Sequence, residues 1–440
     1  MRTVTETVST GIAADAAKLA GRTRIAESAG GGTTTDVEGV FPGVRSCPFA
    51  APAQYGPMRE QPITKVSLAG FAGTDVQNEA WWVSRHEDAR AILNDRRFSS
   101  DRRRENFPIV NGDEKTRERF RAQVPSMIGL DGAEHAVARR AVIGEFTVKR
   151  IAAMRPRIQQ IVDEFVDKML AGENREVDLV QALSLPVPSL VICEMLGVPY
   201  EDHGYFQGRT SAIIRRSSTP EQRATAFEEL RAYLDKLITA KEAQPGDDLF
   251  SRQIARQREE GAVDHAGLVS MAFLLLVAGH ETTANMISLG VVGLLNNPEQ
   301  LAAIKADPTK TPLAVEELLR YFTIVEMVTS RVATEDVEIG GATIKADDGV
   351  VVSGLSANWD PDVFADPERL DVERGARHHI AFGYGPHQCL GQNLARLELQ
   401  IVFDTLFRRI PELRLAVPVD DVDFKTDANI YGVYELPVTW

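Results

Sequence analysis

The sequence predicts a mainly α-helical fold with a smaller β portion, built as one large domain around a cofactor. Apolar residues recur at helical spacing over the long stretches 148–170, 220–241 and 267–295, whereas β patterns are short and few. The length of 440 residues alone would suggest two or three domains, but no linker-like stretch interrupts the chain after about residue 50. We therefore expect one core that a cofactor helps to fill.

Composition and charge argue against several kinds of partner. The formal net charge is −14 at pH 7, and nucleic acids and anionic membranes need a basic footprint, so neither is expected as a main partner. The three cysteines are too few and too scattered for a disulfide framework, which fits a reducing cytoplasm. The N-terminus lacks the charged and apolar regions of a signal peptide. The most apolar stretch carries His280 and Glu281 at its middle, which a membrane span would tolerate badly. We expect a cytoplasmic protein without a membrane span.

The chain divides into an N-terminal tail and a folded part. Residues 1–40 are rich in Thr, Ala and Gly and are predicted to be disordered, and residues 41–440 are predicted to form the domain. Helices are predicted at 148–170, 188–196, 220–241 and 267–295. Short strands are predicted at 64–68, 80–83, 337–339, 342–344 and 350–353, and a last strand pair over 430–438. Residues 203–218 are predicted to be a loop between helices.

A helix is also predicted to begin near Asp131. Asp131 followed by Glu134 has the pattern of an N-cap residue with its capping-box partner. His135 and Arg139 lie four residues apart on this helix and therefore share a face. An exposed polar pair would give the same pattern.

The segment Phe382 to Gly391, FGYGPHQCLG, surrounds one cysteine with glycines. Glycine permits positive φ angles or the close approach of a flat ligand. Apolar residues after Cys389 recur at helical spacing, so the cysteine lies near a helix N-terminus, where N–H groups favour a thiolate. Ligation of haem by cysteine requires this arrangement. The alternative is a buried free cysteine that acts as a small hydrophobe.

Two further motifs lie on predicted helices. AGHETT, at 278–283, is not a zinc-protease motif, because Ala284 stands where the second histidine is needed. Gly279 can leave space beside a flat group, and Thr282 can donate to the carbonyl four residues earlier and loosen the helix. Glu317 and Arg320 lie one helical turn apart, and as an exposed pair they would contribute only about 0.2–0.5 kcal/mol.

These motifs together resemble the cytochrome P-450 family. Phe382, Gly385, Cys389 and Gly391 match its haem-binding signature FxxGxxxCxG at each position. AGHETT resembles the family's oxygen-activation helix, and the ExxR pair follows in the family's order. The resemblance covers residues 41–440. It is nearest to soluble actinomycete members that oxidise secosteroids, statin-like compounds, macrolides and other natural products.

The resemblance implies the cytochrome P-450 fold and a role for each motif. Cys389 would be the axial ligand of the haem iron, Thr282 would bind the oxygen or its water, and Glu281 would help to relay protons. Glu317 and Arg320 would form a buried clamp completed by Arg369, with Arg374 as the rival. The remaining implied haem contacts are the propionate donors His135, Arg139, Arg331 and His387, together with Phe382, Gly383, Gly391 and Gly279.

The implied activity is a haem-thiolate monooxygenase that uses O2 to hydroxylate a mid-sized, largely apolar substrate. Epoxidation, phenol coupling and demethylation are alternatives, as is a haem-thiolate sensor or carrier, which would not need Glu281 and Thr282. The cofactor would be haem b. No GxGxxG opens a helix after a strand, so electrons from NAD(P)H would arrive through a ferredoxin and its reductase, at a basic surface with Arg140 and Arg396. We expect a monomer. The expected pocket walls are Leu275, Ala278, Ile324, Val325, Val328 and Ile430.

Overall fold

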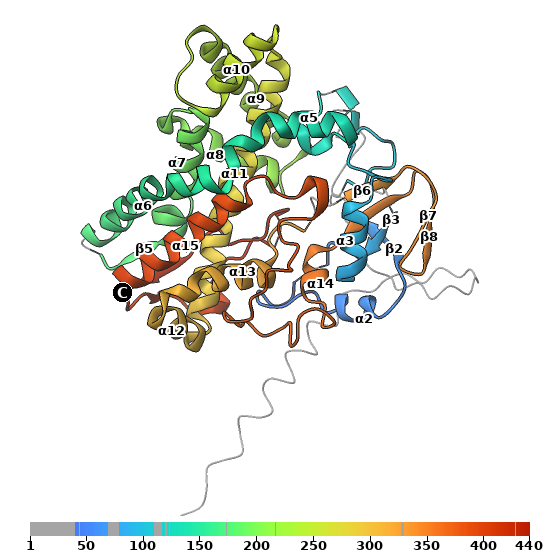
Figure 1. Ribbon diagram of the computed structural model, residues 1–440. Coiled ribbons are helices and arrows are strands. Elements are labelled where there is room, and N and C mark those ends of the chain that lie inside the picture. The colour runs from blue at the N-terminus through green and yellow to red at the C-terminus, as the bar shows by residue number, and fades with distance from the viewer. Residues whose placement is uncertain are drawn as a thin grey trace, which may run out of the picture. The chain divides into compact units, whose positions relative to one another are not determined.

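The computed structural model describes residues 40–43, 45–68, 79–109, 117–118, 121–122, 124–172, 174–215, 217–326, 330–426 and 428–440. These residues fall in one compact unit. The predicted tail, apart from Val40, lies outside them, as does Val328. As the sequence predicts, the fold is mainly helical with a smaller β portion (Figure 1).

Most of the described residues lie in helices (Figure 1). Their bounds are α2 Tyr55–Arg59, α3 His86–Asn94, α5 Gly132–Ile143, α6 Val148–Ala171, α7 Pro186–Leu196, α8 His203–Ile214, α9 Pro220–Ala243, α10 Leu249–Glu260, α11 His265–Leu295, α12 Pro298–Ala306, α13 Thr311–Phe322, α14 Gly354–Asn358 and α15 Gln392–Arg409. The longest of them, α11, packs against α7, α9, α13 and α15. It is long and apolar enough to cross a membrane. However, 56% of its apolar 18-residue stretch is buried inside the protein.

The strands form small sheets. Their bounds are β1 Val40–Phe41, β2 Thr64–Leu68, β3 Glu79–Val83, β4 Phe98–Ser99, β5 Glu176–Asp178, β6 Ser330–Ala333, β7 Val337–Ile339, β8 Ala342–Ile344, β9 Gly349–Val352, β10 Arg414–Leu415 and β11 Pro437–Thr439. The largest sheet has the order β1-β2-β3-β9-β6-β4, and β7 pairs with β8 as the predicted hairpin. The pairing of β6 with β9 places Arg331 opposite Val350.

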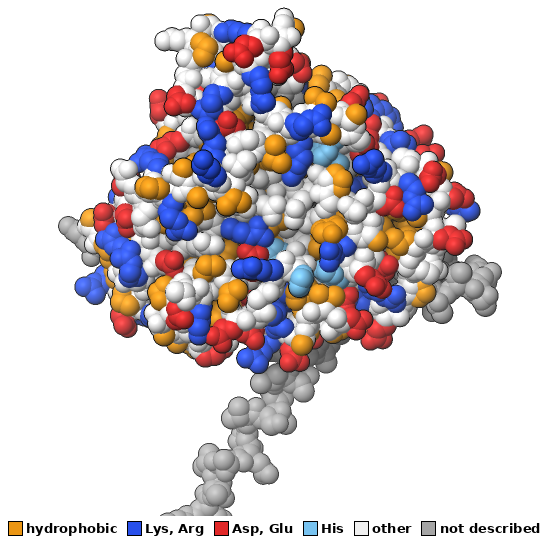
Figure 2. Space-filling view, viewed as in Figure 1, with side chains coloured by type: hydrophobic (Ala, Val, Ile, Leu, Met, Phe, Trp, Pro, Cys, Tyr) orange, Lys and Arg blue, Asp and Glu red, His pale blue; other side chains and the backbone are white. Residues whose placement is uncertain are grey.

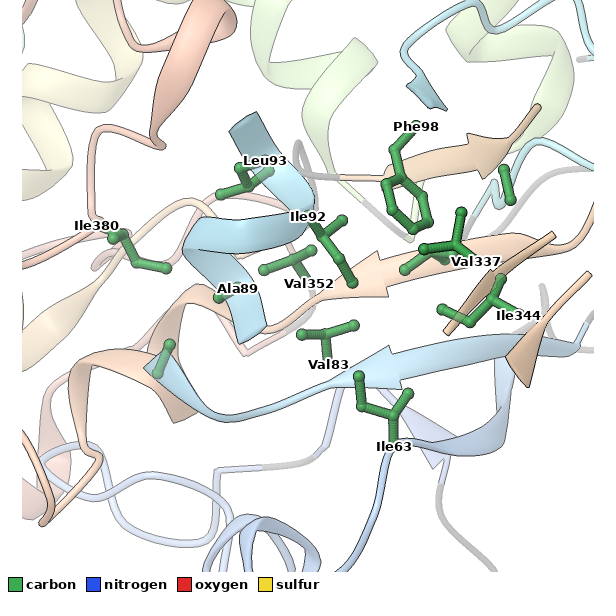
Figure 3. Close-up of a cluster of buried hydrophobic side chains, with 13 residues drawn as sticks. Ile63, Val83, Ala89, Ile92, Leu93, Phe98, Val337, Ile344, Val352 and Ile380 are labelled. Atoms are coloured by element: carbon green, nitrogen blue, oxygen red, sulfur yellow. The ribbon is translucent and has the colours of Figure 1, made fainter. Parts of the chain in front are cut away.

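One face of this sheet is covered by α3. Ala89, Ile92 and Leu93 of α3 are buried against Val83 and Val352 of the central strands (Figure 3). Burying such side chains stabilises the fold by roughly 1.5–3 kcal/mol each, relative to leaving them exposed. The packing fixes the position of α3, whose C-terminal end in turn contacts the cysteine loop.

Three predictions of local structure are wrong: the loop over 203–218, the cap at Asp131 and the strand pair over 430–438. Residues 203–218 contain the helix α8 rather than a loop, because Phe206 and Thr210 are buried against His280 of α11 and tertiary packing outweighs a weak apolar period. Asp131 stands at the N-cap of α5, but its side chain does not cap that helix; it accepts from the Ser100 N–H at 2.8 Å.

The predicted strand pair over 430–438 is reduced to β11, which pairs with β10 and β5 instead of folding back on its own neighbours. Only isolated bridges, such as Val325 with Ile430, occur earlier in this stretch. The cross-strand partners lie far away in the sequence, so local pattern could not identify them.

Candidate active site

The loop before α15 holds Cys389 in a defined position. Gly383 and Gly385 have φ angles of +69° and +71°, which other residues adopt only with strain. A Cβ on Gly385 would lie 2.6 Å from the Leu93 carbonyl oxygen of α3. The Cys389 N–H donates to the Phe382 carbonyl at 2.8 Å and closes the loop. The thiol therefore stands three residues before the first residue of α15, at the helix N-terminus that the sequence predicts.

The protein around Cys389 changes the acidity of its thiol. Its surface is open to solvent, yet burial raises its pKa above the ordinary value, against the opposing effects of the Gly391 N–H, the Arg139 and Arg396 guanidinium groups and the Gln392 N–H. A Cβ on Gly391 would have no neighbour within 4 Å. A cation bound at the sulfur would favour the thiolate.

Four cationic or basic side chains gather beside this loop. The rings of His135 and His387 lie with their centroids 4.0 Å apart and their planes tilted by 30°, and Arg139 donates to the Gln388 carbonyl at 2.7 Å. Burial lowers the pKa of His387 to about 3, with further lowering by Arg331, His135 and Arg139. Arg331 is 5% exposed, and burial lowers its pKa to about 10. Residues from α5, β6 and the cysteine loop thus form one electropositive cluster.

This cluster is suited to an anionic ligand. Among the described residues, no carboxylate lies within ion-pair distance of Arg331 or Arg139, and a carboxylate oxygen of Asp131 is 3.9 Å from the His387 ring nitrogen. The His135 Nε2 atom is buried without a hydrogen-bond partner. Buried cations and unpaired polar atoms are costly unless a ligand satisfies them. The carboxylates of a haem beside a cysteine ligand would do so, and the residues present fit this group.

The middle of α11 has one open face, at Ala278 and Thr282. Ala278 is exposed and Thr282 half-exposed, although most residues around them on this helix are buried. The Thr282 hydroxyl donates to the Ala278 carbonyl at 2.8 Å, the back-bond that the sequence predicts. This face can receive a small polar ligand.

Gly279 has a different role from the one predicted. A Cβ at this position would lie 2.8 Å from Ile192 of α7. The missing side chain therefore points at a neighbouring helix and permits α7 and α11 to pack closely. The structure gives no support for Gly279 as a cofactor contact.

Glu281 is paired rather than free. Its carboxylate is 2.8 Å from the Lys425 ammonium group, which also donates to the Asn285 side-chain oxygen at 2.9 Å. Burial would raise the pKa of Glu281, but Lys425, His280 and the hydrogen bonds from Lys425 and Asn285 outweigh it and leave the pKa lowered. Lys425 lies 144 residues away in the sequence. No sequence signal pointed to Lys425 or Asn285.

The ExxR pair is a buried clamp with a different third member. Glu317 and Arg320 are both fully buried and bonded at 2.8 Å. The third side chain is Arg374, whose Nε lies 3.1 Å from Glu317. The prediction of Arg369 is wrong, because its side chain is exposed and only its carbonyl takes part, accepting from Arg320 and Arg374.

Part of the predicted substrate pocket is assembled. The Tyr431 N–H donates to the Ile324 carbonyl at 2.9 Å, and Ile430 bridges Val325. Leu275 lies one turn before Ala278 on α11. Val328 lies outside the described residues. The C-terminal segment therefore meets the chain after α13, next to the helix that carries Thr282.

The site combines a cysteine at a helix N-terminus, a basic cluster suited to carboxylates, and a helix with a back-bonded threonine. The family model for cytochrome P-450 matches residues 211–411. The chain is 47% identical over 407 residues to vitamin D3 dihydroxylase of Streptomyces griseolus, an alignment covering 92% of this chain and 98% of that protein. It is 48% identical over 413 residues to pentalenic acid synthase of Streptomyces avermitilis, with 93% and 99% covered.

A solved structure agrees with these relatives. Cytochrome P-450 MoxA from Nonomuraea recticatena is 69% identical, with a TM-score of 0.83 over 91% of this chain and 98% of that one. The chain belongs to the cytochrome P-450 family and is a monooxygenase. Family membership implies haem iron and dioxygen, a small-molecule substrate and a redox partner.

Proposed function

We propose that the protein hydroxylates a mid-sized, largely apolar natural product, using haem b and electrons from NAD(P)H passed through a ferredoxin reductase and a ferredoxin. The observation that carries the proposal is the thiol of Cys389 beside a basic cluster in which Arg139 and Arg331 have no carboxylate partner among the described residues. The predicted pocket residues Leu275, Ile324 and Ile430 are apolar and buried. The names of relatives supply further support, since vitamin D3 and pentalenic acid are small, largely apolar molecules. We place the haem domain at residues 41–440 of a monomeric, cytoplasmic protein.

Each of the predicted site residues would have a separate role in the reaction. Haem, when bound, supplies dioxygen activation, for which thiolate ligation favours O–O cleavage. Cys389 would hold the iron, while His135, Arg139, Arg331 and His387 would hold the propionates. Thr282 would bind the oxygen or an ordered water on the open face of α11, and Glu281 would move a proton toward it.

Product analysis tests this proposal. The haem-loaded protein would be supplied with a surrogate ferredoxin and reductase, isotopically labelled dioxygen, and a secosteroid, a terpenoid acid or a macrolide. We expect at least one of these to displace water from the iron, and the product to gain one labelled oxygen atom. Loss of a methyl group or carbon–carbon coupling would indicate one of the alternative reactions. Ligand binding without any product would favour the sensor or carrier.

Replacement of Thr282 by alanine tests the oxygen-side assignment. We expect reductant consumption to continue while product per reductant falls by about tenfold or more, because proton delivery contributes factors of this size or larger. Thr282→Ser keeps the hydroxyl and should retain most of the product. Equal coupling in wild type and Thr282→Ala, measured as product per NADPH, would remove Thr282 from the mechanism.

The electron donor would dock on the side of the cysteine loop. Figure 2 shows many Lys and Arg side chains, interspersed with acidic ones, on the face where α5, α6 and α15 are seen. Arg140 of α5 is exposed. Arg396 is not available, because its guanidinium binds Glu316 at 2.6 Å and covers the Phe382 ring. Arg140 therefore remains the candidate, and Arg396 has a structural role.

Removal of the Arg140 charge should slow reduction of the haem by ferredoxin. We expect Arg140→Ala to lower the bimolecular rate at low salt severalfold and to weaken its salt dependence, because exposed charges steer encounter and are screened by salt. Stopped-flow reduction at increasing ionic strength gives both quantities. Arg97→Ala, which removes an exposed arginine paired with Asp95, is the control. A rate and salt slope equal to wild type would reject Arg140.

A further inference from the structure

Glu316 and Glu317 are consecutive on α13 but have separate partners. Glu317 forms the buried clamp with Arg320 and Arg374. Glu316 instead binds α15, where the Arg396 guanidinium donates from Nε to one carboxylate oxygen at 2.6 Å and from Nη2 to the other at 3.0 Å. The side chains of Glu316 and Arg396 are only 9% and 24% exposed. A two-point pair of this kind fixes the plane of the guanidinium as well as its position.

His379 is the third member of this group. Its Nδ1 atom accepts from the Ala381 N–H at 3.1 Å, so the proton of the neutral ring lies on Nε2. Nε2 donates to the Glu316 carboxylate at 3.1 Å. Burial would raise the pKa of Glu316, but the hydrogen bonds from His379 and Arg396 outweigh it and lower the pKa to about 2. The group therefore contains one lasting anion and one lasting cation.

The group contacts the cysteine loop through Phe382. The Arg396 guanidinium lies 4.5 Å from the centre of the Phe382 ring, and the centre of the His379 ring lies 5.9 Å from it. The Phe382 carbonyl accepts from the Cys389 N–H at 2.8 Å. Burial raises the pKa of the Cys389 thiol, and the Arg396 guanidinium opposes this effect. The charge of Arg396 therefore acts on the sulfur as well as on the ring.

Glu316 limits the effect of this charge. The carboxylate binds the guanidinium directly, so Glu316 and Arg396 together have no net charge, and the potential of such a pair falls off faster with distance than that of a single ion. The groups around the axial ligand of a haem help to set its reduction potential. A cation left alone beside the sulfur favours the reduced iron, which carries one more electron, and an anion left alone favours the oxidised iron.

We propose that Glu316 is a positioning residue that holds Arg396 against Phe382 and cancels its charge beside Cys389, and so keeps the reduction potential of the bound haem low. The inference rests on the proposed function. Without the carboxylate, the guanidinium acts on the sulfur alone and the potential rises. Without the guanidinium, the carboxylate acts alone and the potential falls. Arg396, predicted from the sequence as a ferredoxin contact, thus affects electron supply through the energy of the acceptor.

Potentiometric titration of the haem-loaded full chain, with chemical mediators and no ferredoxin, tests this inference. We expect Glu316→Gln to shift the one-electron equilibrium about tenfold toward the reduced form, a rise of about 59 mV, because an unpaired charge in a partly buried site acts through a low dielectric. Arg396→Gln should shift the equilibrium to a similar extent toward the oxidised form. The double variant Glu316→Gln, Arg396→Gln and the charge-conserving Glu316→Asp should both lie near wild type.

The control is Glu229→Gln, which removes the carboxylate of the exposed Arg209–Glu229 pair at 3.0 Å and should leave the potential at the wild-type value. Arg396 is partly exposed, so Arg396→Gln should fold and can test the sign even if Glu316→Gln does not.

Two results would overturn the inference. One is a shift of Glu316→Gln and Arg396→Gln in the same direction, which would indicate lost packing around Phe382 rather than charge. The other is a wild-type potential in Arg396→Gln, and slower reduction of that variant by ferredoxin would then return Arg396 to the docking surface. Either result in a protein with a haem-thiolate spectrum refutes this inference alone, whereas a wild type without that spectrum refutes the proposed function.

Discussion

Replacement of Cys389 by serine is expected to abolish hydroxylation, with product formation falling by more than about a thousandfold, or about 4 kcal/mol of activation free energy. The reason is electronic, because a serine hydroxyl cannot supply the thiolate charge that favours O–O cleavage. The geometry should survive, since the loop is closed by the Cys389 N–H to the Phe382 carbonyl and not by the sulfur. Product per haem, measured with a substrate that the wild type oxidises, gives the loss.

Cys193 supplies the control for this substitution. It is a buried cysteine of α7, and burial raises the pKa of its thiol to about 12, so it is an inert hydrophobic residue. Cys193→Ser should reduce stability and leave product per haem nearly unchanged. Hydroxylation by Cys389→Ser at a rate within tenfold of wild type would contradict the assignment of Cys389 as the iron ligand.

Replacement of Glu317 by alanine is expected to cost about 3–5 kcal/mol of folding free energy, because it leaves buried guanidinium groups without their carboxylate. Among the described residues, Arg320 would keep the carbonyls of Asn358, Pro367 and Arg369 as its hydrogen-bond acceptors. A whole domain is usually stable by only about 5–15 kcal/mol, so the variant should yield little haem-loaded protein. The midpoint of thermal unfolding and the recovery of haem-loaded protein measure the effect.

Two arginines in the segment after α14 provide matched controls for the clamp. Arg374→Ala should lower the unfolding midpoint clearly, since the Arg374 side chain is only 13% exposed and binds Glu317. Arg369→Ala keeps the carbonyl that takes part and should change stability by no more than about 0.5 kcal/mol. A larger loss from Arg369→Ala than from Arg374→Ala would reverse the assignment that the geometry makes.

The sequence could predict the structural features that depend on residues close together along the chain. The cysteine loop, the back-bond of Thr282 and the shared face of His135 and Arg139 depend on neighbours within about one helical turn or one loop. Apolar periodicity likewise predicted the long helices, and the Gly340-Gly341 turn between two β patterns predicted the β7–β8 hairpin. In each of these features the interacting residues are close along the chain, so their spacing in the sequence determines how they lie relative to one another.

The features that escaped prediction depend on distant partners. Nothing near Glu281 indicates Lys425, and nothing near Gly279 indicates Ile192 of α7. Arg369 and Arg374 stand five residues apart in an irregular stretch, where no period shows which guanidinium turns inward. The helix α8 forms because Phe206 and Thr210 find partners on α11, and its own apolar period is weak.

The central claim is that the sulfur of Cys389 binds the iron of a haem, and the absorption spectrum of the reduced, carbon-monoxide-bound protein tests it most directly. A thiolate ligand shifts the main band well to the red of the band of a histidine-ligated haem. We predict the red-shifted band for the purified, haem-loaded wild type and its loss in Cys389→Ser. A colourless protein after haem supplementation, or the same spectrum from both proteins, would contradict the account.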